Sequence, residues 1–234
     1  MTTLADRVAI VTGGTGALGQ AVTLRFLAAG AHVAVPWIVE DEHARLQARV
    51  PTDGRARLVA ERADVTDPAA MAAFTDRVLA RHRRVDILVT TVGGFAMGAL
   101  VETDRESWDR MLAMNLTSTF TAARAVVPHM VAAGRGRVVT VASRAALPPA
   151  GGFIGYTVAK AGVIAFTQAL AQEVRGQGVT VNTVLPSTMD TPANRAAMPD
   201  ADAKQWVPVE SVAEAILYLT SDEAAHVTGA LLTI

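Results

Sequence analysis

The 234-residue sequence predicts an α/β fold, in which seven parallel strands form one doubly wound sheet with helices on both faces. Two observations carry this prediction. Short β-branched runs, of the kind that a parallel sheet buries on both faces, alternate with segments of helical periodicity. A glycine-rich turn also separates the first such run from the first helical segment. No repeat or low-complexity linker interrupts the alternation, so we expect residues 1–234 to form a single domain.

The composition favours a globular protein with a sizeable core, since 51% of the residues are hydrophobic and 18% are charged. A net charge of −1 gives no general attraction to nucleic acid or to anionic membranes. Cysteine is absent, which excludes disulfides, thiolate metal sites and cysteine nucleophiles. The histidines lack metal-ligand spacing, and the sequence shows neither a signal peptide nor a long uninterrupted apolar run. We therefore expect a cytoplasmic protein with no metal site, no nucleic-acid partner and no membrane partner.

The first strand and helix enclose the earliest functional signal. Val8 to Val11 reads as a buried strand, and a helical pattern runs from Gln20 to Ala29 before Gly30 ends it. Between them lies the turn Thr12-Gly13-Gly14-Thr15-Gly16-Ala17-Leu18-Gly19. Such a turn bares backbone N–H groups at a helix start, where they and the helix dipole hold a pyrophosphate. This context favours a dinucleotide site, and the alternative is a merely tight turn between strand and helix.

The ends of the next two strands concern the adenosine half of a dinucleotide. The second strand is expected at residues 31–35, and in doubly wound folds an acid at its end selects NAD, whereas an Arg accommodates the 2′-phosphate of NADP. Here the tip reads Pro36-Trp37-Ile38, so neither selector is in place. The third strand is expected from about residue 57, and it leads to Asp64. That carboxylate is either a turn residue or an acceptor for the adenine amino group.

The middle of the sequence supplies two further polar candidates. A helix that begins at Asp67 leads to a fourth strand at residues 85–89. A long helical pattern from Trp108 to Ala133 then contains Asn115, a poor helix former. We expect Asn115 either to be satisfied within the core or to face an active site. The fifth strand, residues 137–141, ends at Ser143.

Tyr156 and Lys160 open the next helical segment, which extends to about Arg175. Residues four apart lie on one face of a helix, so the phenol and the ammonium look into the same space. A fixed positive charge about 5 Å away lowers the pKa of a phenol by about two units at an effective dielectric constant near 20. Tyr156 is therefore a candidate acid/base. The alternative is an ordinary surface pair on an amphipathic helix.

The remaining chain completes the alternation of strands and helices. A sixth strand is expected at residues 179–184, a helix at residues 209–219 and a last strand at residues 230–234. A proline-punctuated stretch from Pro186 to Pro208 lies between the sixth strand and that helix. We expect it to form a mobile substrate loop at about residues 187–208.

The glycine turn, Asn115, Ser143 and the spacing of Tyr156 and Lys160 together resemble the short-chain dehydrogenase/reductase family, over essentially the whole chain. The similarity is to its compact, single-domain, 3-oxoacyl-reductase-like branch. The resemblance implies a Rossmann-type NAD(P)-dependent oxidoreductase that interconverts a ketone and a secondary alcohol by hydride transfer. It implies that Tyr156 is the general acid/base, that Lys160 lowers its pKa and binds the nicotinamide ribose, that Ser143 donates to the substrate oxygen, and that Asn115 holds a water on the proton relay.

The resemblance also implies a set of cofactor contacts, without deciding between NAD and NADP. They are Gly13, Thr15, Gly16, Ala17, Leu18, Gly19, Trp37, Asp64, Val65, Val92, Gly93, Tyr156, Lys160, Pro186, Met189 and Thr191. By analogy we expect a homodimer or homotetramer. The cleft would be lined by residues 94–97, 145–153 and 188–207, which are mainly apolar or small and favour an uncharged carbonyl substrate.

The sequence departs from the family pattern at four places. Ala17 stands where the middle glycine of the turn belongs, and Thr90-Thr91 replaces an Asn-Asn pair after the fourth strand. Ser187 replaces a glycine, and the sequence ends at Ile234 within the last expected strand. The three loop departures favour an alternative function, a dinucleotide-binding sensor or regulatory protein that has lost catalysis. The presence of all four catalytic residue types argues against it.

Overall fold

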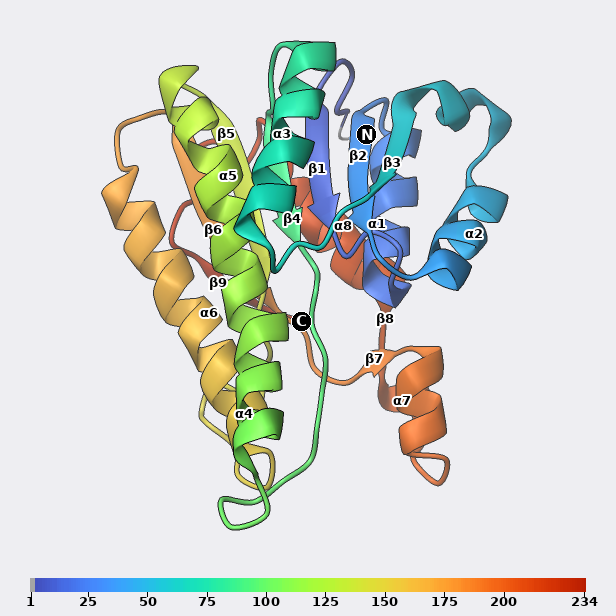
Figure 1. The fold of residues 1–234 in the computed structure, drawn as a ribbon, viewed down its shortest axis with the longest axis vertical. Helices are drawn as coiled ribbons and strands as arrows, with labels where there is room; N and C mark the ends of the chain where they lie inside the picture. Colours follow the sequence, from blue (N-terminus) through green and yellow to red (C-terminus); the bar gives the residue numbers. More distant parts are fainter. Residues whose placement is uncertain (1–2) are drawn as a thin grey trace.

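A computed structural model of the protein describes residues 3–234, and its centre is one parallel sheet of seven strands (Figure 1). The strand order is β3-β2-β1-β4-β5-β6-β9, so the order reverses between β1 and β4. The predicted doubly wound class and strand number are confirmed. The strands are β1 (Val8–Thr12), β2 (His32–Trp37), β3 (Leu58–Arg62), β4 (Ile87–Thr90), β5 (Gly136–Val141), β6 (Val179–Leu185) and β9 (Leu231–Thr233).

Helices cover both faces of the sheet because successive side chains of each strand point to opposite faces. Val11 faces a core that includes Phe26 of α1 (Ala17–Ala28) and Ile216 of α8 (Val209–Thr220). Ile10 faces the other core, which is built with α3, α5 and α6 (Figure 1). The helices of this second face are α3 (Pro68–His82), α4 (Arg105–Leu112), α5 (Ser118–Ala132) and α6 (Ile154–Glu173).

Two helices differ from the sequence expectation near the amino terminus. Helix α1 begins at Ala17 rather than at Gln20, because Gly19 lets the first helical turn approach the carbonyl of Gly13. A Cβ atom at Gly19 would lie 1.9 Å from that oxygen. Helix α2 (Glu40–Arg49) was not predicted. It buries only Leu46, so the sequence carries no apolar periodicity there. A short 3₁₀ helix (Thr52–Arg57) follows it.

The long predicted helix around Asn115 is interrupted. A π-helical turn at Ala113–Thr117 joins α4 to α5, and Asn115 lies within it. Such turns insert one extra residue into a helix and are frequent at functional sites. Pro128 is accommodated within α5.

The expected loop at residues 187–208 contains regular structure. Strand β7 (Met189–Asp190) pairs in parallel with β8 (Val207–Pro208), and α7 (Pro192–Ala197) and a 3₁₀ turn (Ala203–Gln205) lie between them. In Figure 1 this unit projects beyond the main sheet, next to the carboxyl ends of the strands. Of the prolines that suggested a loop, Pro192 stands at the first position of α7, where a missing N–H is harmless, and Pro208 is the N-cap of α8.

Helix α6 is long and apolar enough to cross a membrane by length and composition alone. In this fold it packs on β6 and α4, and buried residues along it include Ala159, Val163 and Thr167. It is therefore built as a core helix of the α/β domain.

Candidate active site

The structure brings Ser143, Tyr156 and Lys160 together at the carboxyl ends of the central strands. Lys160 is buried, with 6% of its surface exposed, and its Nζ donates a 2.9 Å hydrogen bond to the carbonyl oxygen of Val141 in β5. The same Nζ lies 5.9 Å from the centre of the Tyr156 ring. Ser143 follows β5 directly, and its Oγ accepts a hydrogen bond from the Ala145 backbone N–H. A cation, a phenol and a hydroxyl thus converge on one space.

Burial dominates the electrostatics of this group. It raises the pKa of the Tyr156 phenol, while the Ser143 hydroxyl beside it acts in the opposite direction. Burial also lowers the pKa of Lys160 from 10.5 to about 8. The net shift of the Tyr156 pKa is therefore upward, opposite to the lowering that we expected from Lys160. The reason is that the ammonium lies beside the ring and donates to Val141, while the whole pair is removed from water.

Asn115 is satisfied within the core, which is the first of its two predicted alternatives. It is fully buried, and its Nδ2 donates to the carbonyl oxygens of Met111 and Gly94 at 3.0 and 3.1 Å. Its Oδ1 accepts from the N–H of Gly94 at 3.3 Å. Asn115 is thus satisfied, and it also fixes the loop that follows β4. A Cβ atom at Gly93 would lie 2.7 Å from Asn115 Oδ1 and 3.3 Å from Lys160 Nζ, so Gly93 lies between two of the predicted catalytic side chains.

The threonines that replace the Asn-Asn pair brace the centre of the sheet. Thr91 donates from both its backbone N–H and its Oγ1 to the carbonyl oxygen of Thr12, at 3.0 and 2.8 Å. The side chain of Thr90 is buried next to Thr119 of α5. The ends of β1 and β4 are therefore joined by hydrogen bonds, even though threonines stand where the family pattern has asparagines.

The glycine turn fits the pyrophosphate of a dinucleotide. Gly13 has a φ of 71°, and a Cβ atom there would lie 2.7 Å from the Val92 nitrogen. Helix α1 starts after Gly16 with no side-chain cap and no acidic residue in its first turn, so its first N–H groups are left for an anion. Ala17 is exposed at the first helical position, while Leu18 is buried against the core.

At the expected adenosine end, Trp37 and Asp64 make contacts within the protein. The Trp37 ring stacks on His43 of α2 at 4.3 Å between centroids and 5° between planes. Asp64 is exposed, and its Oδ1 accepts hydrogen bonds from the N–H and Oγ1 of Thr66 at 2.8 and 2.7 Å, which is the turn role that we set against adenine binding. Val65 is buried beside it.

The stretch after β6, where we expected the nicotinamide contacts, is tied to the segment that carries Ser143. Pro186 is buried, and its carbonyl oxygen accepts from the N–H of Arg144 at 3.1 Å, which ties this stretch to the residue after Ser143. Thr191 caps α7, since its Oγ1 accepts from the N–H of Asn194 at 3.2 Å. The side chain of Asn194 also donates to the Met189 carbonyl oxygen at 2.8 Å. Thr191 and the Met189 carbonyl are therefore engaged in shaping this segment.

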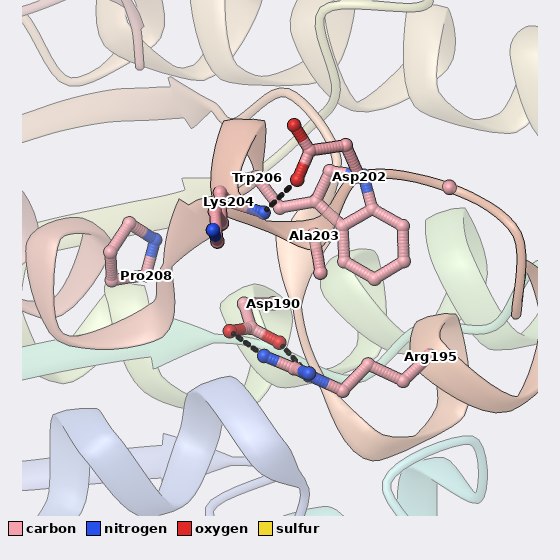
Figure 2. A pocket seen from close by; sticks show the side chains of 8 residues that line it. Asp190, Arg195, Asp202, Ala203, Lys204, Trp206 and Pro208 are labelled. Carbon is pink, nitrogen blue, oxygen red and sulfur yellow. Dashed lines mark hydrogen bonds and ion pairs between the residues drawn. The ribbon is translucent and has the colours of Figure 1, made fainter.

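A hollow of about 530 Å³ lies in the same segment, within the unit that contains β7, α7 and β8 (Figure 2). Arg195 crosses it to bind both oxygens of Asp190, at 2.6 and 2.8 Å, and this contact lowers the pKa of Asp190. Trp206 and Lys204 line the other side. None of the four predicted catalytic residues lines this hollow.

Two aromatic residues complete the surroundings of Tyr156. Phe95 meets the Tyr156 ring edge-on at 5.0 Å, and Phe153 lies 5.4 Å from Phe95 and 6.1 Å from Tyr156. The loop that carries Phe95 is tied to the loop that carries Phe153, because the N–H of Gly98 donates to Gly152 at 2.9 Å. The sequence ranges expected to line the cleft include both residues, but their stacking could not be read from spacing. The only available signal was an apolar residue directly after a glycine pair.

Across residues 3–234, no three His, Asp or Glu side chains are grouped closely enough to hold a metal ion.

Comparison with known proteins assigns the family. A family model described as short chain dehydrogenase matches residues 7–202 of this chain. The chain belongs to the short-chain dehydrogenase/reductase family. As a member of this family it is an NAD(P)-dependent enzyme of carbonyl and alcohol redox chemistry, with a nicotinamide dinucleotide as its cofactor.

Relatives in this family align along nearly their whole length. The chain is 32% identical over 236 residues to the 3-oxoacyl-(acyl-carrier-protein) reductase FabG of Escherichia coli K12, which covers 97% of this chain and 95% of that protein. It is 34% identical over 241 residues to the D-threitol dehydrogenase of Mycolicibacterium smegmatis, covering 99% and 92%. A short-chain type dehydrogenase/reductase structure from Mycobacterium ulcerans superposes with a TM-score of 0.93 at 28% identity, covering 99% and 89%. The 3-oxoacyl-reductase-like resemblance of the sequence is confirmed.

Proposed function

We propose that this short-chain dehydrogenase/reductase reduces a ketone to a secondary alcohol, and oxidises the alcohol in reverse, with Tyr156 as the general acid/base. The observation that carries the proposal is the convergence of Ser143, Tyr156 and Lys160, with Lys160 Nζ 5.9 Å from the Tyr156 ring. The bound nicotinamide supplies the hydride. The protein then has to orient the carbonyl and stabilise the negative charge that develops on its oxygen.

The hydroxyls of Ser143 and Tyr156 are the two donors for that oxygen. Ser143 is held by the N–H of Ala145, so its proton is free to point at the substrate. Tyr156 gives its proton to the oxygen as the carbon–oxygen double bond becomes single. The phenol is protonated at neutral pH, so Tyr156 starts as the proton donor in the reducing direction. Lys160 supplies a positive charge beside the phenolate that remains.

Three features support an uncharged, apolar substrate. Phe95, which is 54% exposed, and Phe153 present aromatic surface around Tyr156. Met97 on the same loop is 73% exposed and extends the apolar rim. Arg195, one of the two cations in residues 187–208, is already paired with Asp190. A ketone with an aromatic or other apolar substituent therefore suits the site better than a carboxylate or a phosphate.

The test is a comparison of Tyr156→Phe with the wild-type enzyme. We expect dissociation constants for NADH and NADPH within about twofold of wild type by fluorescence titration, and loss of turnover across a panel of ketones. Wild-type enzyme that binds a dinucleotide but turns over no ketone or alcohol would instead favour the sensor or regulatory function. The departures from the family pattern at Ala17 and Ser187 favour the sensor or regulatory function.

The organisation of the protein is part of the same proposal. We infer that residues 1–234 act as a single domain, that residues 187–208 move as the substrate loop, and that the enzyme is a cytoplasmic homodimer or homotetramer acting on a small molecule. The position of β7, α7 and β8 next to the carboxyl ends of the strands supports the loop assignment.

A further inference from the structure

A carboxylate from α2 occupies the adenosine side of the glycine turn. Glu42 Oε2 accepts a 3.1 Å hydrogen bond from the Oγ1 of Thr15, and Thr15 is 5% exposed. Thr15 belongs to the turn that precedes α1, and Glu42 lies in the first turn of α2. The end of β2, where doubly wound folds place the residue that reads the ribose, is occupied by Trp37. An acid thus reaches the ribose-reading position from the following helix.

The start of α2 is fixed in a way that holds Glu42 on the turn. Trp37 and His43 stack with nearly parallel planes, and Leu46 is fully buried beneath the helix. Glu40, in the same turn, lies 3.6 Å from His43 Nδ1, and Asp41 is exposed. Of the three acidic residues in this turn, Glu42 is the one whose hydrogen bond reaches the glycine turn.

The cations in this neighbourhood are placed less closely. Arg49 Nη1 donates to Gln20 Oε1 at 2.9 Å, and Gln20 Nε2 in turn donates to the Thr15 carbonyl at 2.7 Å, so Arg49 is separated from Thr15 by one side chain. Arg62 is exposed at the end of β3, in register with Trp37. Its register beside Trp37 makes Arg62 a candidate to receive a 2′-phosphate from the neighbouring strand.

We propose that Glu42 makes this enzyme select NAD(H) over NADP(H), an inference that rests on the proposed function of the glycine turn as the dinucleotide site. A carboxylate beside the turn accepts hydrogen bonds from a ribose diol and repels a 2′-phosphate dianion. Thr15 presents its hydroxyl to the carboxylate and so fixes the direction of Glu42. Glu42 is the specificity-determining residue, in place of the acid that β2 lacks.

The experiment measures binding of NADH and of NADPH by fluorescence titration, without any carbonyl substrate. For the wild-type protein we expect NADH to bind at least tenfold more tightly than NADPH. Glu42→Gln should reduce this ratio at least tenfold, mainly by tighter binding of NADPH. Asp41→Asn, which removes the same charge one residue earlier, should change the ratio less than threefold. Arg62→Ala should weaken NADPH binding without reversing the preference. Thermal melting of each variant checks that it is folded.

Each outcome decides the inference. Tighter binding of NADPH by the wild-type protein overturns it, and so does a ratio that Glu42→Gln and Asp41→Asn change equally, because the effect would then be a general acidic field. If the wild-type protein binds both dinucleotides but prefers NADPH, only the role of Glu42 fails. If it binds neither, the dinucleotide site itself fails, and the proposed function fails with it.

Discussion

Replacing the buried cation with Lys160→Met tests the electrostatics of the candidate active site directly. Burial lowers the pKa of Lys160 from 10.5 to about 8. Between these values the unfolded chain binds more protons than the folded protein, so stability rises with pH. The stabilisation is fully present above pH 10.5 and is lost as the pH falls through about 8. Lys160 therefore costs the folded enzyme stability at neutral pH.

The size of the effect follows from the shift. A change of one pKa unit corresponds to about 1.4 kcal/mol, so the full shift is worth about 3 kcal/mol. Between pH 7 and pH 9.5 the free energy of unfolding of the wild-type protein should gain about 2 kcal/mol from this group. In Lys160→Met that gain should vanish. At pH 7 the variant loses the hydrogen bond to Val141, which costs about 1–3 kcal/mol and offsets much of the relief.

Urea unfolding at pH 7 and at pH 9.5 measures this difference. The matched control is Lys204→Met, because Lys204 is the other lysine of the sequence and is exposed. The control should keep the gain of about 2 kcal/mol that the wild-type protein shows. Equal pH dependence in the wild-type protein and in Lys160→Met would refute the reasoning, since it would mean that Lys160 is solvated in the folded state.

Three further substitutions probe the surroundings. Gly93→Ala should lower the melting temperature and turnover, because the methyl would lie 2.7 Å from Asn115 Oδ1, whereas Gly151→Ala, with open space around it, should change neither. Thr91→Val should cost about 1 kcal/mol in urea unfolding through loss of the hydrogen bond to Thr12, and an unchanged midpoint would contradict the bracing role. Phe95→Ala should raise KM for aryl ketones at least fivefold but leave KM for a small aliphatic ketone within twofold; equal changes for both would reject an aromatic contact.

The fold and the placement of Tyr156 beside Lys160 could be predicted because their signals are local. The strands are buried on both faces, so β-branched runs such as Val8 to Val11 mark them directly. Tyr156 and Lys160 share a helix, and their spacing alone places them on one face. The absence of apolar periodicity around Leu46 left α2 unpredicted, and with it the approach of Glu42 to Thr15.

The electrostatics could not be predicted from spacing, because they depend on burial. The pairing of Tyr156 with Lys160 indicates an attractive charge, but removal from water by the surrounding elements outweighs it. The role of Asn115 was open for the same reason. Its partner Gly94 lies twenty-one residues away along the chain, and only the tertiary fold brings the two together.

The π-helical turn at Ala113–Thr117 sets a limit on how the length of this chain can vary. Each helical residue rotates the following ones by about 100° around the axis. Deletion of one residue from the turn would restore a regular helix, but it would swing either Asn115 away from Gly94 or the buried face of α5 away from the sheet. Insertion or deletion of a single residue in this turn should therefore abolish activity, although surface loops tolerate such changes.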